Sequence, residues 1–235
     1  MFERTGRPQR LRGDIVGRVW SFRDVTLQRR AEAALRASEA HLRDLAIRDG
    51  LTGIFNRRFA LEQLAAALTA AASIGERVAV ALLDVDYFKQ VNDQHGHLVG
   101  DAVLRDVARV LSERLRGSDL VGRYGGEEFV VIMRRATAEQ AAGVLDALRA
   151  RLSDRPGTAE VPRYTFSGGV AQFPDDGGDP MALLACADLR LYAAKHAGRN
   201  RLMITTPSTT TASSPRSRPT ARSSPASGST APPPT

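Results

Sequence analysis

A Gly-Gly pair between two apolar segments is the feature that most constrains how this chain can fold. Residues 120–133 have the pattern of two strands, and Gly125-Gly126 stands between them where a hairpin turn is expected. A hairpin makes neighbouring strands antiparallel, which argues against a doubly wound nucleotide-binding fold with a parallel sheet. The sheet that contains this hairpin is therefore expected to be largely antiparallel.

The segments around the hairpin alternate between strand and helix patterns. Residues 78–83 are an unbroken apolar run typical of a buried strand, and residues 163–173 and 202–204 predict two further strands. Apolar residues at helical spacing predict four helices, over residues 56–72, 100–115, 141–152 and 180–194. This order predicts an α/β sandwich of the α+β type, with helices flanking a central sheet. Gly168 is expected to weaken the strand that contains it, because glycine has no side chain to pack.

The net charge of +7 does not indicate a nucleic-acid-binding surface. Residues 1–30 hold eight arginines against three acids, and residues 207–235 hold three arginines and no acid. The positive charge therefore lies at the two ends, and the part between them is close to neutral. Nucleic-acid-binding domains gather Lys and Arg on one face, so no nucleic-acid partner is expected.

Composition excludes several other classes of protein. Cys186 is the single cysteine, so the chain has neither an intrachain disulfide nor a cysteine cluster for zinc. No apolar run reaches the roughly 18 to 20 residues of a membrane span, and no signal peptide begins the chain. A cytoplasmic protein without a membrane partner is the expectation. Residues 207–235 are mostly Ser, Thr, Pro, Ala and Arg, which predicts a disordered tail.

Residues 28–49 predict a helix that connects an N-terminal segment to the sandwich. Five residues follow the three- and four-residue steps of a coiled-coil seam: Ala31, Leu35, Ser38, Leu42 and Leu45. A dimerising connector is the favoured interpretation, and a single amphipathic helix packed on its own domain is the alternative. The expected organisation is an N-terminal hairpin, a connector helix, a main domain and a tail, over residues 1–26, 27–48, 49–206 and 207–235.

Two acidic pairs stand beside the expected strand ends. Asp84-Val85-Asp86 follows the strand over residues 78–83, and Glu127-Glu128 follows Gly125-Gly126. If the two strands are neighbours, Asp84 and Glu127 face one another with oxygen ligands only, which favours Mg²⁺ or Mn²⁺ and phosphoryl chemistry. Each signal is weak alone, because acids and glycines are also common in solvated turns.

Longer segments around these acids form two motifs, Arg123-Tyr124-Gly125-Gly126-Glu127-Glu128-Phe129 and Asp84-Val85-Asp86-Tyr87-Phe88-Lys89-Gln90-Val91-Asn92-Asp93. They resemble the two signature segments of the GGDEF family of diguanylate cyclases. Further family motifs recur in the same order: Asp49-Gly50-Leu51-Thr52, Asn56-Arg57-Arg58, Gly96-His97, Gly100-Asp101, Ala187-Asp188, Leu191-Tyr192, Ala194-Lys195 and Gly198-Arg199-Asn200. The resemblance covers about two thirds of the chain. It implies a sheet like that of nucleotide cyclases and the polymerase palm.

Residues 13–26 are expected to form two short strands around a turn, with Val19, Trp20, Phe22 and Val25 available for burial. This segment resembles the closing hairpin and the Asp-Val-Thr exit of a PAS sensor domain. Only this last fragment of such a domain is present. It offers no ligand pocket, so no sensing activity is assigned to it.

The resemblance implies the residues of a metal site and a catalytic role for two of them. Asp84 and Glu127 would bind metal through their carboxylates and Val85 through its backbone carbonyl, with support from Glu128. Glu127 is the candidate that takes the proton from the attacking 3′-hydroxyl. Lys89 would stabilise charge that develops in the transition state. The implied cofactor is Mg²⁺ or Mn²⁺.

The resemblance also implies the residues that bind the nucleotide. Asn92 and Asp101 match the residues that hydrogen-bond guanine. This role suits their chemistry, since an amide and a carboxylate together can pair with the acceptors and donors of guanine. They would select GTP over ATP. Lys195 and Arg199 match phosphate contacts, and Gly125-Gly126 would let the substrate approach the backbone closely.

The implied reaction joins two GTP molecules into cyclic di-GMP and releases pyrophosphate. Each domain holds one GTP, so two domains must meet face to face, which gives a dimerising connector a catalytic purpose. Arg116 and Asp119 match the family's inhibitory product site, in which Arg clamps a phosphate and Asp takes the donors of guanine. An ordinary solvated ion pair is the alternative for these two residues.

Two other functions stay open. A catalytically silent cyclic di-GMP receptor or scaffold would use Arg116 and Asp119 without turnover, although the intact Glu127-Glu128 pair disfavours this role. A cyclase that makes a different cyclic mono- or dinucleotide would need relaxed base selection. Product analysis with GTP and ATP together would identify such a cyclase.

Overall fold

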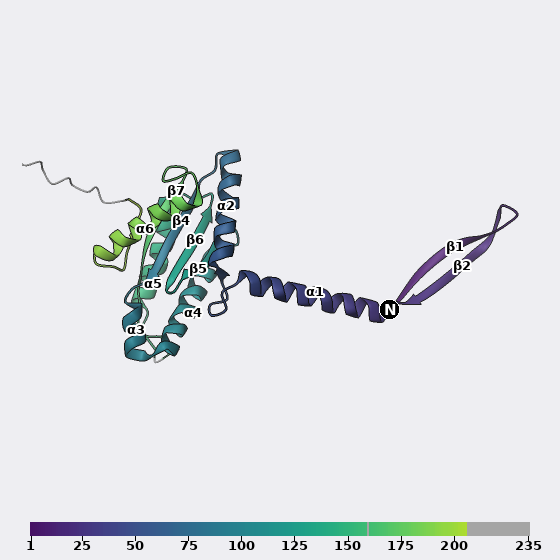
Figure 1. Ribbon diagram of the computed structural model, residues 1–235, viewed down its shortest axis with the longest axis horizontal. Helices are drawn as coiled ribbons and strands as arrows, with labels where there is room; N and C mark the ends of the chain where they lie inside the picture. The colour runs from purple at the N-terminus through teal and green to yellow at the C-terminus, as the bar shows by residue number, and fades with distance from the viewer. Residues whose placement is uncertain (159, 206–235) are drawn as a thin grey trace, which may run out of the picture.

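Six strands form the central sheet of the computed structural model, which describes residues 1–158 and 160–205 (Figure 1). Across the sheet they are β3 (Phe55–Asn56), β5 (Leu120–Gly125), β6 (Glu128–Arg134), β4 (Val78–Val85), β7 (Phe166–Phe173) and β8 (Leu202–Met203). The four inner strands are antiparallel to one another, whereas the short β3 and β8 pair in parallel at the two edges. The predicted, largely antiparallel sheet is confirmed.

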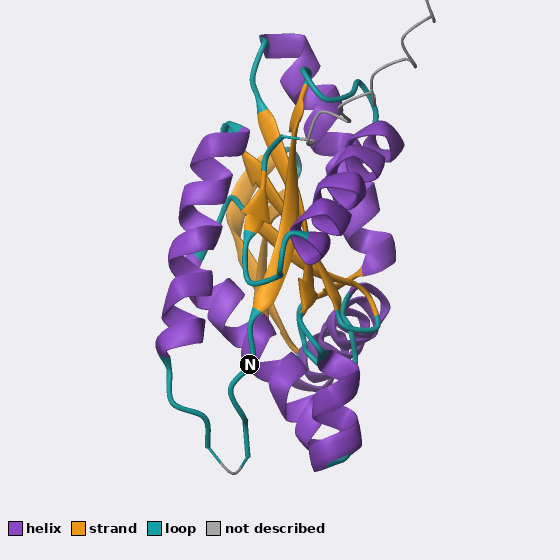
Figure 2. Cartoon of the chain, turned by 90° about the vertical axis from the view of Figure 1, so that its left-hand side faces the viewer, coloured by secondary structure: helices purple, strands orange, loops and turns teal. Residues whose placement is uncertain are grey.

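Helices cover both faces of this sheet (Figure 2). One face carries α4 (His97–Arg114) and α5 (Ala138–Asp154), and the other carries α2 (Arg57–Ile74) and α6 (Pro180–His196). β4 is buried on both sides, because Leu83 packs with α4 and α5 while Val80 and Leu82 pack with α2 and α6. This double burial explains the unbroken apolar run in the sequence.

Gly168 and Gly169 lie in the middle of β7, where packing leaves no room for a side chain. A Cβ on Gly168 would lie 2.5 Å from the side chains of both Leu83 and Leu202. A Cβ on Gly169 would overlap the backbone of α6. Gly168 was expected to weaken this strand; in the structure it lies between the Leu83 and Leu202 side chains, which would have to shift to admit a larger residue.

α3 (Phe88–His95) was not predicted from the sequence patterns. It is only eight residues long and buries Val91 alone, so no apolar periodicity marks it. It begins after Tyr87, whose φ of 56° is left-handed, and ends at Gly96, whose φ is 84°. Gly96 joins α3 directly to α4, which places the residues of the two helices side by side.

The N-terminal hairpin is longer than predicted. Its strands are β1 (Phe2–Leu11) and β2 (Asp14–Asp24), with Arg12-Gly13 at the turn, so the prediction of two strands within residues 13–26 is wrong. β1 was missed because its Arg-, Gly- and Pro-containing sequence does not alternate between apolar and polar residues. Of the four apolar residues expected to be available for burial, only Val25 is buried, and Trp20 is 44% exposed.

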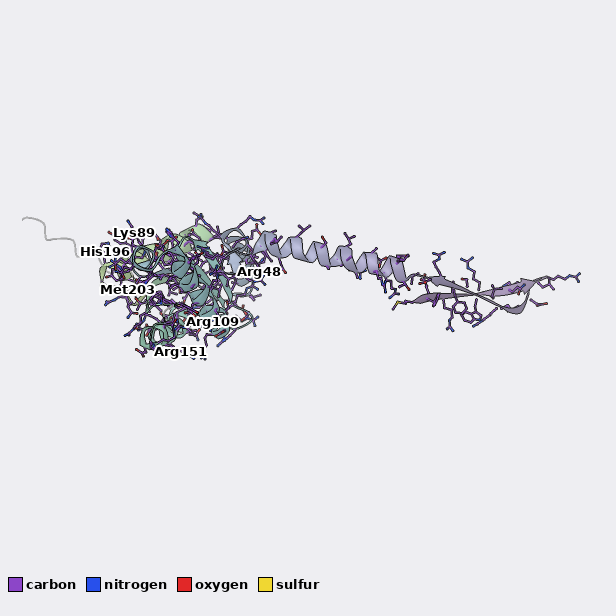
Figure 3. The ribbon with its side chains drawn as sticks, turned by 90° about the horizontal axis from the view of Figure 1, so that it is seen from below. Arg48, Lys89, Arg109, Arg151, His196 and Met203 are labelled. Carbon is purple, nitrogen blue, oxygen red and sulfur yellow. The ribbon has the colours of Figure 1, made fainter. Side chains whose placement is uncertain are left out.

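The connector helix α1 (Thr26–Ile47) extends away from the domain, and the hairpin lies at its far end (Figures 1 and 3). Leu35, Leu42 and Leu45 are 60%, 61% and 64% exposed. The alternative in which this helix packs on its own domain is therefore wrong. None of the helices within the described residues has the length and apolar character to cross a membrane. The tail predicted over residues 207–235 lies outside the described residues.

Candidate active site at the end of strands β4 and β6

The two predicted acidic segments meet because β4 and β6 are neighbours in the sheet. Asp84 is the register partner of Glu128, not of Glu127. Glu127 lies in the turn before β6, and its carbonyl oxygen accepts a hydrogen bond from the Val85 N–H at 3.4 Å. The expected juxtaposition of acids is present, but Glu128 is the one directly across from Asp84, because Gly126 and Glu127 form the turn outside the ladder.

These acids concentrate negative charge where little water reaches it. Burial raises the pKa of Asp84, and the charges of Glu127 and Asp86 raise it further against the opposing effect of Lys195. Burial also raises the pKa of Glu128, with the charge of Asp84 as the next cause. A cation bound here would relieve this mutual repulsion.

Lys195 reaches this cluster from the last turn of α6. Its Nζ lies 2.8 Å from Oδ2 of Asp84, whose side chain is 9% exposed. Lys195, predicted as a phosphate contact, and Asp84, predicted as a metal ligand, therefore form an ion pair in the structure.

The donor set at this end of the sheet fits a hard divalent cation. Within residues 1–158 and 160–205, no three His, Cys, Asp or Glu side chains converge as a ready-made metal cage. Mg²⁺ is commonly held by one or two carboxylates while substrate phosphates and waters complete its shell. Asp84 and Glu127, with the Val85 carbonyl, therefore suit a cation that binds together with a nucleotide.

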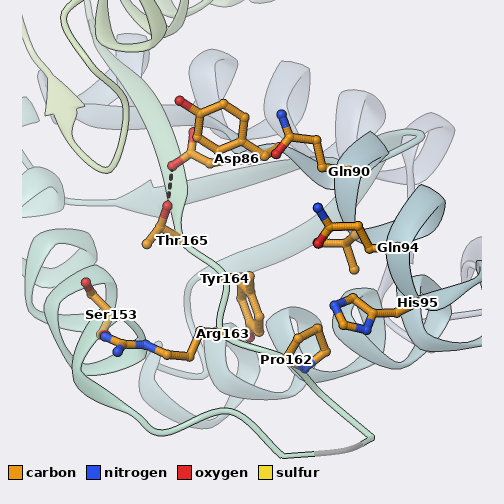
Figure 4. Close-up of a pocket in the computed structure, with 11 residues that line it drawn as sticks. Asp86, Gln90, Gln94, His95, Ser153, Pro162, Arg163, Tyr164 and Thr165 are labelled. Carbon is orange, nitrogen blue, oxygen red and sulfur yellow. Dashed lines mark hydrogen bonds between the residues drawn. The ribbon is translucent and has the colours of Figure 1, made fainter.

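Asp86, the second acid of the first predicted acidic pair, is buried. Its carboxylate accepts hydrogen bonds from the hydroxyls of Thr165 and Ser167 at 2.6 and 2.7 Å, and from the Asn200 N–H at 3.0 Å. Figure 4 shows the Thr165 bond beside a hollow of about 280 Å³ next to α3. Asp86 thus fixes the loop after α6, and its partners, 79 to 114 residues away, leave no signal in the local sequence.

That loop carries Arg199, one of the predicted phosphate contacts. The Arg199 guanidinium lies 4.5 Å from the ring centroid of Tyr87 and donates a hydrogen bond to the Tyr87 hydroxyl at 3.3 Å. Lys89 is exposed on α3 and has no ion pair among the described residues. It lies, with His196, toward the end of the domain away from Arg48 (Figure 3). The predicted phosphate-binding cations therefore come from α3, from the last turn of α6 and from the loop that follows α6.

The predicted guanine-binding residues lie on two helices in contact. A Cβ on Gly100 of α4 would overlap Oδ1 of Asn92 on α3, so Asn92 packs against the residue that precedes Asp101. Asn92 and Asp101 are both half-buried. The structure thus places Asn92 at the α3–α4 contact, against the residue next to Asp101 in the chain.

The motif that begins at Asp49 holds the Gly-Gly turn in place. Asp49 accepts hydrogen bonds from the N–H and the hydroxyl of Thr52 and lies 3.2 Å from Arg123. Arg123 donates from Nε to the carbonyl oxygen of Gly126 at 2.9 Å. The contact between Asp49 and Arg123 was not predicted, because it joins residues 74 positions apart in the chain.

Arg116 and Asp119 lie in a turn at the other end of β5. The Asp119 carboxylate accepts a hydrogen bond from the Arg116 N–H at 3.1 Å, and the Asp119 N–H donates to the Arg116 carbonyl at 2.9 Å. Six residues of β5 separate this turn from Gly126, which places it roughly 20 Å from the acidic cluster. It is therefore a separate location from the candidate active site.

Replacing Glu128 by glutamine is expected to stabilise the protein in the presence of a chelator. In the parent protein the pKa of Glu128 is raised, so the folded state binds the Glu128 proton more tightly than the unfolded state does. The parent therefore loses stability as pH rises past 4.5, the ordinary pKa of a glutamate. Removing a like charge opposite Asp84 should contribute up to about 1 kcal/mol at pH 7 and nothing at pH 3. Urea unfolding at both pH values measures this. Glu139→Gln is the control, because a backbone hydrogen bond lowers the pKa of Glu139; equal effects of both variants would contradict the prediction.

Carboxylates that can hold a divalent metal, beside basic side chains that can hold phosphate, are suited to metal-assisted phosphoryl chemistry. A family model described as "Diguanylate cyclase, GGDEF domain" matches residues 46–201. The chain therefore belongs to the GGDEF diguanylate cyclase family, whose chemistry is nucleotidyl transfer.

Curated relatives and solved structures agree with this family. The response regulator PleD of Caulobacter vibrioides is 40% identical over 173 residues, which are 72% of this chain and 38% of that protein. The diguanylate cyclase DgcP of Pseudomonas aeruginosa is 38% identical over 74% of this chain and 26% of its own length. The chain thus spans less than half of these relatives. A structure of the coiled coil and GGDEF domain of DgcB from Caulobacter crescentus, in complex with c-di-GMP, is 32% identical, covers 77% of this chain and 99% of that one, and has a TM-score of 0.67.

Proposed function

We propose that this chain condenses two GTP molecules into cyclic di-GMP and releases two pyrophosphates. The observation that carries the proposal is the convergence of Asp84, Glu128 and Lys195 at the end of β4, beside the turn that holds Glu127. The name of DgcP and the c-di-GMP bound to DgcB support the same reaction for related chains.

Asp84, Glu127 and the Val85 carbonyl would hold Mg²⁺ or Mn²⁺, with Glu128 in support. When bound, the metal lowers the pKa of the attacking hydroxyl and neutralises phosphate oxygens. Glu127 accepts the proton as the 3′-hydroxyl of one GTP attacks the α-phosphorus of the other. Lys89 stabilises the charge that develops as pyrophosphate leaves. The same step with the roles exchanged closes the ring.

Asn92 and Asp101 would select guanine, and Lys195 and Arg199 would hold the triphosphate beside Gly125-Gly126. Supplying the nucleotide-free protein with equal GTP and ATP tests this assignment by chromatographic identification of the products. Cyclic di-GMP as the sole cyclic product is expected. An adenine-containing product would contradict the base selection. No product, combined with tight binding of added cyclic di-GMP, would identify a silent receptor instead.

Catalysis in a homodimer is part of this proposal, because one domain offers one set of nucleotide-binding residues. The uncovered leucines of α1 support pairing along the predicted seam. Feedback inhibition is a further part, in which the product binds at Arg116 and Asp119. The order in the Arg116–Asp119 turn supports it, because a preformed turn lowers the entropic cost of binding.

A charge in the middle of the seam is expected to weaken the dimer and so lower turnover. Leu42→Asp should reduce specific activity by about ten-fold or more at low protein concentration, because the side chain would be buried unpaired in the seam. Activity should recover as protein concentration rises. Ala33→Asp, an exposed position of α1 outside the seam, is the control. Two results together would contradict dimer-dependent catalysis. The specific activity of the parent would stay constant over a wide dilution series, and Leu42→Asp would have the same specific activity as the parent.

A further inference from the structure

A hollow of about 470 Å³ lies beside the Arg116–Asp119 turn, between the end of α2 and the end of β6. Three arginines line it, namely Arg116, Arg134 and Arg135, together with a single acid, Glu76. Arg134 is the last residue of β6 and was not among the predicted site residues. An excess of positive charge on a concave surface is the usual setting for an anionic ligand.

Only one of these arginines is neutralised by a neighbour. Nε of Arg135 lies 2.7 Å from the Glu76 carboxylate, and the Arg135 N–H donates to the Arg77 carbonyl. In the part of the chain that the structure describes, neither Arg116 nor Arg134 has a carboxylate within 4.0 Å, and their side chains make no hydrogen bond. Two uncompensated guanidinium groups therefore share one hollow.

Arg134 stands at the junction of this hollow with a second one. The second hollow, of about 280 Å³, is lined by Arg134 together with Ser118, Asp119 and the half-buried rings of Phe55 and Phe59. Ser118 and Arg134 line both hollows. A ligand centred on the turn can therefore meet Arg116 and Arg134 together.

We propose that Arg134 is a second phosphate-binding arginine of the product site, an inference that rests on the proposed feedback inhibition. A cyclic dinucleotide carries two phosphodiesters, each with one negative charge. Arg116 takes one of them and Arg134 takes the other, since a guanidinium can bind two phosphate oxygens at once. Binding also removes the repulsion between the two arginines.

The test is calorimetric titration of the full chain, stripped of nucleotide, with cyclic di-GMP. Arg134→Ala is expected to raise the Kd by about ten- to a hundred-fold, the range for losing a charged hydrogen-bonding group. Arg134→Lys should lose less, because it retains the charge but not the paired donors. Arg135→Asn is the matched control: this residue lines the same hollow, its charge is already paired with Glu76, and Asn tolerates its left-handed φ of 54°.

The outcomes separate this inference from the proposed function. If Arg116→Ala weakens binding while Arg134→Ala binds like the parent, the product site stands and the role of Arg134 is wrong. If the parent does not bind cyclic di-GMP, or Arg116→Ala leaves its Kd unchanged, the product site itself is wrong and the role of Arg134 falls with it. Equal losses in Arg134→Ala and Arg135→Asn would show a general effect of charge and would also overturn the specific role.

Discussion

Replacement of Asp84 by asparagine is expected to lower kcat/KM for GTP by at least about a hundred-fold. The change preserves the size of the side chain and removes the charge that a divalent cation needs. A bound metal stabilises the charge that develops in the transition state by several kcal/mol, so its loss lowers the rate by this factor. Asp84 is 7% exposed and lies directly across from Glu128, so its carboxylate is held in place at the centre of the acidic cluster. Initial rates of pyrophosphate release over a range of GTP concentrations measure the effect.

A control must show that this loss does not come from unfolding. Burial raises the pKa of Asp84, so the neutral amide is compatible with its surroundings, and the variant should melt within a few degrees of the parent. Asp154→Asn makes the same chemical change at an exposed position on the end of α5 and should retain full activity. Activity of Asp84→Asn within five-fold of the parent would contradict a metal-binding role for this carboxylate.

The second large effect is expected on stability, from Gly169→Ala. A Cβ at this position would overlap the Ala187 carbonyl oxygen and the Leu191 nitrogen of α6. Backbone atoms cannot rotate away as a side chain can, so β7 and α6 would have to separate. We expect the free energy of unfolding to fall by about 3 kcal/mol or more, at the upper end of what overpacking costs.

Gly143→Ala provides a control with the opposite sign. Gly143 is exposed on α5, and a Cβ there would meet nothing within 4 Å. Alanine is favoured over glycine inside a helix by roughly 0.5 to 1 kcal/mol, so this variant should be more stable than the parent. Urea unfolding of both variants measures the difference. Unfolding of Gly169→Ala within 0.5 kcal/mol of the parent would show that α6 does not pack on β7 as described.

Most of the fold could be predicted because its central elements have regular apolar patterns. β4 and the β5–β6 hairpin were identified from an apolar run and a Gly-Gly turn, and the four long helices from their periodicity. Three elements were missed, namely β1, β3 and α3. None of them has a regular apolar pattern of its own, and each forms because of the segments next to it in the structure. β3 has only two residues, and α3 buries a single side chain.

The candidate site could be predicted only in part, because the sequence does not specify the register between strands. It indicated that the acids of β4 and β6 lie together, but not that Glu128 is directly across from Asp84 or that Lys195 pairs with Asp84. The hydrogen bonds of Asp86 and the Asp49–Arg123 ion pair could not be predicted either, because each contact joins segments that are far apart in the sequence. No sequence motif contains Arg134, and its proposed role in binding the product depends on the hollow that it shares with Arg116 in the structure.

The most direct test of the central claim is to follow cyclic di-GMP and pyrophosphate in the same reaction. Nucleotide-free protein is incubated with GTP and Mg²⁺, beside a Glu127→Gln variant at the same concentration. The proposed reaction predicts two pyrophosphates for each cyclic di-GMP from the parent, and at least about a hundred-fold slower formation of both products by the variant. Equal rates for parent and variant, or pyrophosphate release without cyclic di-GMP, would contradict a diguanylate cyclase that works through this site.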